Sequence, residues 1–268
     1  MKVSVENLSV RFHRGAEALR NVSLEAAPGA FVAVIGPSGC GKSTLLTAMA
    51  SLLSPDEADV RGTIRIDGVD VRQGAGRGSL GYVFQRDTLF PWRTVLENVW
   101  AGLEIRRLPK AERVERARQL IDAVGLSGFE HYYPHQISGG MRQRTSLIRT
   151  LAYDPEVVLM DEPFASLDAQ TRNVMQEELV RIVLHERKTI VFVTHSVDEA
   201  IILGDRVVVL THRPGRLKTA MPIDIPRGAR RWDVLGADAR FVRYRQDIHR
   251  LIREEFDAQE RPAEAVEA

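Results

Sequence analysis

The chain has only one cysteine, Cys40, among its 268 residues, so it cannot form an intrachain disulfide. It also lacks any apolar run that approaches the ~18 residues of a membrane-spanning helix. Residues 1–6 show no long apolar stretch of the kind found in signal peptides. These features predict a protein of the reducing cytosol. If it works at a membrane, something else must anchor it there.

The chain also lacks an excess of charge of one sign. Lysine and arginine total 37 against 36 aspartates and glutamates, which leaves a net charge of +1 and a pI near 8.0. A strongly basic balance is typical of DNA-binding domains, so we expect no nucleic-acid partner. Arginine is dense at residues 227–231 and 240–253, and we expect both runs to form solvated surfaces.

A glycine-rich octet is the most informative feature that the chain does contain. Residues 36–43, Gly-Pro-Ser-Gly-Cys-Gly-Lys-Ser, fit the pattern G-x-x-x-x-G-K-[ST] of a phosphate-binding loop. The apolar residues 30–35 predict a buried strand before it, and residues 44–50 predict a helix after it. In this context the backbone amides point at a bound anion. The alternative, a glycine-rich turn that only caps a helix, fits the context less well.

The octet assigns roles to individual side chains. Lys42 is expected to hold the β and γ phosphates of a nucleotide, and Ser43 to place its hydroxyl on Mg²⁺. Cys40 is either a small residue without a specific role or a redox-active one, because a thiol at a helix N-terminus has a lowered pKa. The predicted phosphate-binding residues are Gly36, Pro37, Ser38, Gly39, Cys40, Gly41, Lys42, Ser43 and Thr44.

Two acids follow a second apolar run. Residues 157–160 are Val-Val-Leu-Met, and Asp161 and Glu162 come directly after them. A buried strand delivers such side chains to its C-terminal end, where ligand sites of α/β proteins lie. We expect Asp161 to hold Mg²⁺ and Glu162 to act as general base on the attacking water. The alternative is a strand that merely ends at a charged edge.

A second glycine-rich turn, Ser138-Gly139-Gly140, also leads into a predicted helix. Its backbone amides suit another phosphate contact. One chain rarely needs two such loops for one nucleotide. We therefore expect this turn to serve a nucleotide held by another copy of the chain.

The remaining pattern predicts an α/β protein with a mostly parallel sheet, because short apolar runs alternate with helical segments in the second half. Amphipathic helices are predicted at residues 110–124 and near 241–252. Residues 74–78 predict a flexible loop and residues 261–268 a disordered end. The predicted strands lie at residues 3–5, 22–24, 63–68, 81–84, 157–160, 189–193 and 206–210.

In their order along the chain, these motifs resemble those of the ATP-binding subunits of ABC transporters, over essentially the whole chain. Residues 36–43 match the Walker A motif, residues 157–161 the Walker B motif, and Glu162 the catalytic glutamate. The shorter matches are Gln85 at the Q-loop, Ser138-Gly139-Gly140 at the signature loop, Ser166-Leu167-Asp168 at the D-loop, His195 at the switch histidine, and Phe12 at the aromatic residue that stacks on adenine. Each short motif is weak alone, but their common order is specific.

The resemblance implies one ABC ATPase domain with a P-loop NTPase core. Its parts are a core at about 1–86 and 156–230, which includes an N-terminal antiparallel β element, an inserted helical subdomain at about 87–155, and a C-terminal helix and tail at 231–268. The cofactors implied are ATP and Mg²⁺, with Ser43, Gln85 and Asp161 around the metal.

The resemblance also implies how two copies would work together. In a head-to-tail homodimer, each nucleotide lies between Lys42 of one copy and Ser138 of the other. Asp168 and the signature glycines belong to the same nucleotide-binding set, while Gln85 and His195 join Glu162 as catalytic residues. Two departures from the family pattern, Met141 in place of a glutamine and Ser196 in place of an acid, are expected to leave activity intact.

Residues 81–95, 159–164 and 167–172 narrow the resemblance to importers of nitrate, sulfonates and taurine. This implies a peripheral subunit at the cytoplasmic face of the cell membrane that powers import of a small anionic solute. Its partners would be integral permease subunits and, indirectly, an extracytoplasmic binding protein. The alternatives are an importer of another small solute, a soluble ABC ATPase that acts on DNA or ribosomes, and a scaffold with inactive motifs.

The segment after Gln85 carries a dense apolar cluster, Leu89, Phe90, Pro91 and Trp92. An exposed cluster of this kind predicts a partner surface, and tryptophan is a frequent interface anchor. The alternative is that these side chains fill the core of the helical subdomain. The resemblance to importers favours a surface on which the permease docks.

Overall fold

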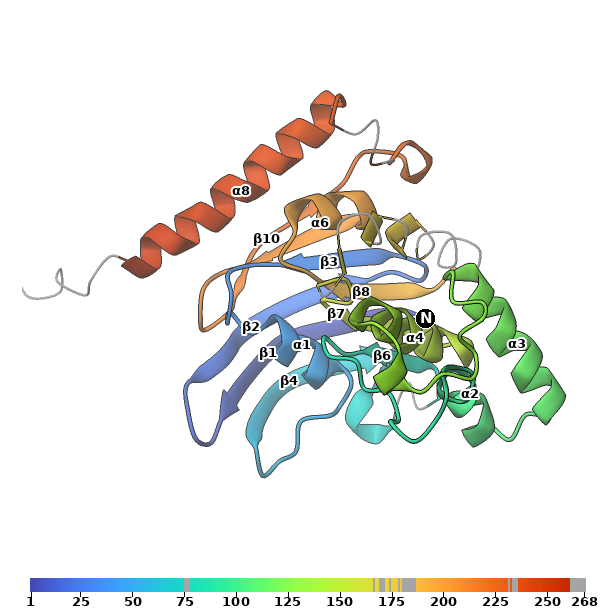
Figure 1. Cartoon of the computed structure of the whole chain (residues 1–268). Coiled ribbons are helices and arrows are strands. Elements are labelled where there is room, and N and C mark those ends of the chain that lie inside the picture. The colour runs from blue at the N-terminus through green and yellow to red at the C-terminus, as the bar shows by residue number, and fades with distance from the viewer. Residues whose placement is uncertain are drawn as a thin grey trace, which may run out of the picture. The chain divides into compact units, whose positions relative to one another are not determined.

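The computed structural model describes residues 1–74, 78–165, 167–168, 172–173, 175–177, 179, 187–230, 232 and 236–260 (Figure 1). The chain forms two compact units, one made of Met1–Ala75 with Thr189–Ala268 and the other of Gly76–Lys188. The glycine-rich octet therefore belongs to the first unit. Asp161 and Glu162, the two consecutive acids, belong to the second.

An antiparallel sheet forms the N-terminal part of the first unit, as predicted. Its strands run in the order β2-β1-β4-β5. Val3 and Val5 of β1 are buried while Glu6 is exposed, so the period-two pattern corresponds to a half-buried strand. The bounds are β1 Val3–Phe12, β2 Glu17–Ala26, β4 Ala58–Ile66 and β5 Val69–Asp70.

Parallel strands carry the glycine-rich loop. β3 (Phe31–Ile35) pairs in parallel with both β8 (Thr189–Val193) and β9 (Arg206–Leu210). β10 (Leu217–Pro222) pairs antiparallel with β9. Every residue of β3 and β8 is buried, as expected for parallel strands. Helices α1 (Lys42–Met49) and α6 (Val197–Leu203) follow β3 and β8, so both begin at the carboxyl edge of these strands.

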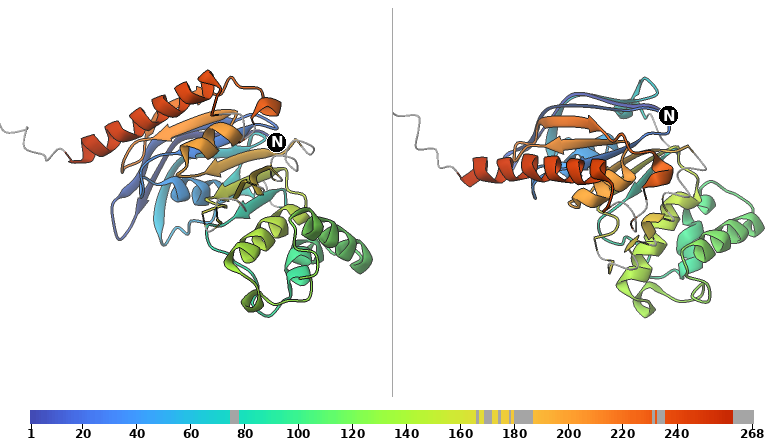
Figure 2. Two further views of the ribbon diagram at one scale, coloured as in Figure 1. Left: turned by 45° about the horizontal axis from the view of Figure 1, so that its top comes forward. Right: turned by 90° about the horizontal axis from the view of Figure 1, so that it is seen from above.

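A long helix, α8 (Ala239–Glu260), contacts α6 and β9 (Figure 2). Phe241 and Ile248 are buried, which confirms the predicted apolar face. The arginines of α8 are exposed, as predicted for residues 240–253. Short 3₁₀ turns of this unit lie at Val71–Gln73 and Arg227–Ala229.

The prediction that residues 227–231 form a solvated surface is wrong for two arginines. The side chain of Arg230 is 4% exposed. Arg227 pairs with Asp205, and the Asp205 carboxylate also accepts from the backbone N–H of Phe31 at 2.8 Å. Spacing along the sequence could not show these contacts, because the partners lie far away in the chain. The guanidinium of Arg230 donates to the backbone carbonyls of Gly204, Ile223 and Ile225.

The second unit combines a parallel strand pair with helices. β6 (Leu80–Val83) pairs with β7 (Val157–Asp161). Helix α2 packs against α3 and α4. The helix at 110–124 is confirmed, whereas the predicted buried strand at 81–84 stops one residue early, since Phe84 is 39% exposed. The helical elements are α2 Val95–Ile105, α3 Lys110–Ala123, the 3₁₀ turn Pro134–Gln136, and α4 Gly139–Ala152.

These elements confirm the α/β fold class, while the proposed subdomain bounds stay a prediction. The centre of the predicted loop (75–77), Ser166 and the predicted disordered end (261–268) lie outside the described residues. Among the residues that are described, no helix has the length and apolar character needed to cross a membrane.

Arg230→Met should lower the free energy of unfolding by about 2 kcal/mol, because buried carbonyl oxygens lose a charged donor. Thermal or denaturant unfolding measures this effect. Arg250→Met is the matched control, since the side chain of Arg250 is 68% exposed. An equal free energy of unfolding for the two variants would contradict the proposal that the bonds of Arg230 to backbone carbonyls stabilise the fold.

Candidate functional site

The glycine-rich loop between β3 and α1 depends on backbone geometry that favours glycine. Gly39 and Gly41 have φ values of +74° and +106°, in the left-handed region. A Cβ at Gly41 would lie 2.8 Å from the carbonyl oxygen of Ala18 on β2. The strand therefore leaves no room for a side chain, and the loop can wrap closely around an anion at the N-terminus of α1.

Lys42 is buried beside this loop. It is 7% exposed, and its Nζ donates to the carbonyl oxygens of Gly36 and Pro37, both at 2.9 Å. Ser38 and Ser43 are exposed, so the loop is accessible from solvent. A buried ammonium next to an accessible loop suits a phosphate group, since opposite charge stabilises a buried cation.

The structure contradicts the redox interpretation of Cys40. Cys40 is 1% exposed. Burial raises the pKa of its thiol, although the positive charge of Lys42 acts to lower it. A raised pKa leaves less of the reactive thiolate at neutral pH. The position of Cys40 close to a helix N-terminus therefore matters less than its loss of contact with water.

In the second unit, the predicted acids lie at the end of β7. Asp161 is its last residue and is 7% exposed. Glu162 follows with a φ of 45°, an uncommon value for a residue other than glycine. Gln85 lies just beyond β6, and its Nε2 donates to Glu162 Oε2 at 3.2 Å. The parallel pairing of β6 and β7 thus brings the predicted Q-loop and catalytic carboxylate together.

Ser138 caps α4 and leaves the start of that helix accessible. Its Oγ accepts from the backbone N–H of Met141 at 3.2 Å, and Ser138 and Gly139 are both exposed. Because Met141 contributes its backbone amide here, the departure from the family pattern does not affect this cap. Asp168 is also exposed, and its charge acts on Arg144 of α4.

His195 and Phe12 complete the predicted set in the first unit. His195 is exposed directly after β8, at the same strand edge as the glycine-rich loop. The preceding Thr194 bonds to Glu199, and Ser196 caps α6 by accepting from the Glu199 N–H at 3.3 Å. Ser196, which stands where the family pattern often has an acid, therefore serves as the N-cap of α6. Phe12 ends β1 and is half-buried.

Sequence reasoning missed two arginines that tie the segment after Gln85 to α4. Arg142 Nε donates to Asp87 Oδ2 at 2.9 Å. Arg149 donates to the carbonyl oxygen of Thr88 at 2.7 Å. The only sequence signal was the position of these arginines on the helix that follows Ser138, which does not identify their partners.

Asn98 of α2 holds the same segment from another side. It is 0% exposed, and its Oδ1 accepts from the Phe90 N–H at 2.8 Å. Its Nδ2 donates to the carbonyl oxygens of Phe90, Arg93 and Thr94. One side chain therefore fixes the backbone on both sides of Trp92.

The apolar cluster divides between interior and surface. Leu89 is buried at 9% exposure, so the core alternative holds for that residue. Trp92 is 70% exposed, and its ring centroid lies 5.5 Å from that of Phe90. Trp92 therefore stands on the surface of the second unit, where a partner can reach it.

The chemistry of the predicted metal ligands suits Mg²⁺. Ser43, Gln85 and Asp161 all offer oxygen atoms, which are the ligands that this ion prefers. Within the described ranges, no group of three or more His, Cys, Asp or Glu side chains gathers as a metal site.

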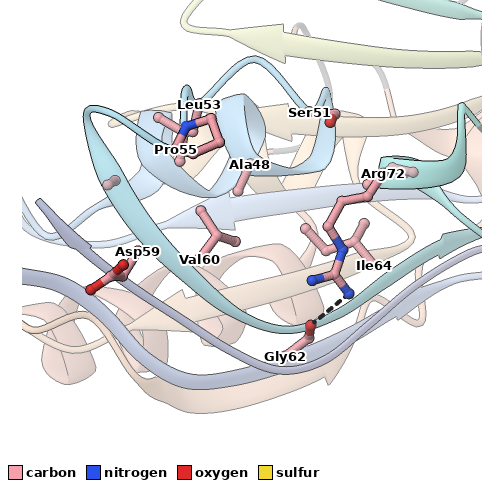
Figure 3. Close-up of a pocket in the computed structure, with 11 residues that line it drawn as sticks. Ala48, Ser51, Leu53, Pro55, Asp59, Val60, Gly62, Ile64 and Arg72 are labelled. Atoms are coloured by element: carbon pink, nitrogen blue, oxygen red, sulfur yellow. Dashed lines mark hydrogen bonds between the residues drawn. The ribbon is translucent and has the colours of Figure 1, made fainter.

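A separate cavity of about 590 Å³ lies beside α1 and β4 (Figure 3). Ala48 and Ile64 contribute apolar walls, and the Arg72 guanidinium donates to the Gly62 carbonyl at 3.3 Å. Arg72 also pairs with Asp70 at 2.7 Å. Because this pair neutralises the cation, we assign no ligand to the cavity.

Comparison with known proteins places this geometry in a family. The model of the ABC transporter family matches residues 19–165. An uncharacterized ABC transporter ATP-binding protein of Methanocaldococcus jannaschii is 51% identical over 259 residues, covering 95% of this chain and 92% of that protein. The taurine import ATP-binding protein TauB of Rhizobium johnstonii is 42% identical over 248 residues, covering 91% and 92%. The aliphatic sulfonates import ATP-binding protein SsuB of Bacillus cereus is 41% identical over 229 residues, covering 84% and 88%.

A solved structure shows the same likeness. It is a dimeric post-hydrolysis state of an ATP-binding cassette bound to ADP and Pi, with a TM-score of 0.74 and 30% identity. The match covers 83% of this chain and 99% of that chain. The fold and the phosphate loop thus define a P-loop ATPase that binds ATP. The chain belongs to the ABC transporter family.

Cys40 gives a pH-dependent prediction. Because the pKa of its thiol is raised above the ordinary value of 9.0, the folded chain at pH 8 should react with a thiol reagent more slowly than the unfolded chain, about tenfold for each unit by which the pKa is raised. The rate should keep rising at pH values where a free thiol has reached its plateau. A native rate that levels off below pH 8 would contradict the raised pKa.

Proposed function

We propose that this chain is the ATP-hydrolysing subunit of an ABC importer for a small anionic solute of the nitrate, sulfonate or taurine type. The observation that carries the catalytic proposal is the hydrogen bond from Gln85 to Glu162, directly after the strand that ends at Asp161. The import proposal is supported by relatives named for taurine and aliphatic sulfonates import.

ATP would bind with its β and γ phosphates beside Lys42 and its adenine stacked on Phe12. Base stacking on an aromatic ring is worth about 1–3 kcal/mol by analogy with nucleic-acid binding. Ser43, Gln85 and Asp161 would hold Mg²⁺, which when bound neutralises phosphate charge. The loop that surrounds the phosphates consists of Gly36, Pro37, Ser38, Gly39, Cys40, Gly41, Lys42, Ser43 and Thr44.

Hydrolysis would be the transfer of the γ-phosphoryl group to water. Glu162 accepts a proton from the attacking water, the bond between the β and γ phosphates breaks, and ADP and phosphate leave. Gln85 orients the Glu162 carboxylate through its hydrogen bond. The φ of 45° at Glu162 costs of order 1–3 kcal/mol, and strain of this kind is concentrated at functional sites. His195 would contact the γ-phosphate from the β8 edge.

Two copies would complete each nucleotide site. The exposed Ser138 and Gly139, with Gly140, present the N-terminal amides of α4 to a phosphate of the partner copy. Asp168 would lie at the same interface. ATP favours this closed homodimer because it contacts both copies, and hydrolysis removes that link. The dimeric, ADP-bound cassette among solved structures supports this arrangement.

Trp92 would anchor the membrane permease. Its backbone is fixed on both sides by Asn98, while the segment that carries it begins at Gln85. Movement of Gln85 on ATP binding or hydrolysis would therefore pass to the docking surface. Permease binding would hold the subunit peripherally at the cytoplasmic face of the membrane. An extracytoplasmic binding protein would select the solute, which never contacts this chain, and another small solute is the alternative.

Glu162→Gln should retain ATP binding but lose hydrolysis by about 10²-fold or more, because the general base is removed while the charge on the phosphate side is unaffected. Lys42→Ala should instead weaken ATP binding or abolish turnover. ATPase rates with the permease present, together with nucleotide affinity, separate the two effects. Wild-type rates for Glu162→Gln would remove Glu162 from the mechanism.

Trp92→Ala should weaken permease binding by about 2 kcal/mol, the usual loss at an interface anchor. ATP affinity and melting temperature of the isolated subunit should stay near wild type, because surface substitutions change stability by about 0.5 kcal/mol. Co-purification with the permease measures the first effect.

Ile105→Ala is the control for this test, because Ile105 is 81% exposed at the other end of α2. It should leave permease binding unchanged. A large fall in the melting temperature of Trp92→Ala with permease binding retained would place the docking surface elsewhere.

A further inference from the structure

Glu255 is a buried acid on α8 that none of the steps above uses. It is 7% exposed. Its Oε1 lies 2.8 Å from Lys218 Nζ, and its Oε2 accepts from the His212 backbone N–H at 3.0 Å and lies 3.0 Å from His212 Nδ1. Burial alone would raise the pKa of Glu255, but the bonds from Lys218 and His212 outweigh it and lower the pKa. The side chain is therefore a charged, well-bonded carboxylate at neutral pH.

His212 lies in a tight loop, residues 211–216, between β9 and β10. The Thr211 N–H bonds to the Arg216 carbonyl at 2.9 Å, and the Thr211 hydroxyl accepts from the Arg216 N–H at 3.0 Å. The same hydroxyl lies 3.0 Å from the His212 carbonyl oxygen. These bonds close the loop at its base and join His212 to the residues on both sides of the loop.

The 211–216 loop also packs against the glycine-rich phosphate loop. Gly215 donates to the Ala18 carbonyl at 2.9 Å, and a Cβ at Gly215 would collide with the carbonyl oxygen of Cys40. Just before the 211–216 loop, the Leu210 carbonyl lies 2.9 Å from the place that a Cβ of Gly36 would take. Backbone atoms of this region thus touch the phosphate loop at two points.

We propose that Glu255 is a positioning residue for the phosphate loop. By holding His212, it keeps the 211–216 loop against Cys40 and so fixes the backbone around Lys42. This inference rests on the proposed role of residues 36–43 as the ATP site. Without the carboxylate, the 211–216 loop can withdraw, which frees the Cys40 peptide and loosens the phosphate loop.

Cys40 is a direct probe of this contact, because it is the only cysteine of the chain and is 1% exposed. In the full-length subunit without nucleotide, Glu255→Ala should raise the rate of Cys40 labelling by a thiol reagent about tenfold, because the loop that covers the thiol withdraws. The charge of Glu255 also raises the pKa of this thiol, and Glu255→Gln separates the two effects because it removes the charge but keeps the shape. Glu255→Ala should also weaken ATP affinity about fivefold, because the binding-competent conformation of the phosphate loop becomes less populated. Glu255→Gln, which keeps the shape but not the charge, should give an intermediate value for both.

Glu254→Ala is the matched control. Glu254 neighbours Glu255 and also contacts Lys218 at 2.8 Å, but its side chain is 51% exposed, and among the described residues no hydrogen bond joins it to His212. It should leave both the labelling rate and the ATP affinity at wild-type values.

If Glu255 only stabilised the packing of α8, its substitution would lower the melting temperature without changing the labelling rate or the ATP affinity. Labelling of Glu255→Ala at the wild-type rate, or faster labelling with unchanged ATP affinity, would overturn the inference. If Glu255→Ala does not fold, Glu255→Gln carries the test with the same outcomes. If ATP fails to protect Cys40 in the wild type while the Glu255 variants label faster, the contact stands and the proposed ATP site is wrong.

Discussion

The close packing of backbone around the Lys42 ammonium is the constraint on which the first unit depends. The ammonium donates to the carbonyls of Gly36 and Pro37, and neighbouring backbone lies so close to the loop that a Cβ at Gly36 or Gly41 would collide with it. Ala18 on β2 sets one such limit. A strand of the antiparallel sheet thus restricts the backbone of the phosphate loop, which begins at the end of β3 and ends at the start of α1.

In the second unit, one short segment connects Glu162, the proposed general base, to the surface. Gln85 contacts Glu162 at one end of a short segment, and Trp92 stands exposed at the other. Arg149 and Asn98 hold the chain between them through backbone groups. A segment fixed in this way transmits displacement better than a free loop, because few of its torsions can absorb the motion.

Motifs and strands could be predicted from the sequence because each is encoded by neighbouring residues. The strand at 157–161 is a run of apolar side chains, and the phosphate loop is an octet with fixed spacing. Residues whose roles depend on distant partners could not be found in this way. Arg230 looked like part of a solvated run, yet its partners are carbonyls from two other segments.

Cys40 shows the same limit in its chemistry. A local rule, the helix N-terminus, gave the wrong direction for its pKa, because burial by the surrounding chain has the larger effect. Glu255 had no local signal at all, since the residues it bonds belong to β10 and to the loop before it.

Asn98 fixes the backbone around Trp92 without contacting the Trp92 side chain through a hydrogen bond. Since its amide bonds only to backbone atoms, the turn that carries Trp92 keeps its course whatever residue occupies position 92. The side chain at position 92 can therefore change by a single substitution without repacking the interior. In the docking proposed above, subunits with the same ATP-hydrolysing site could in this way serve different permeases.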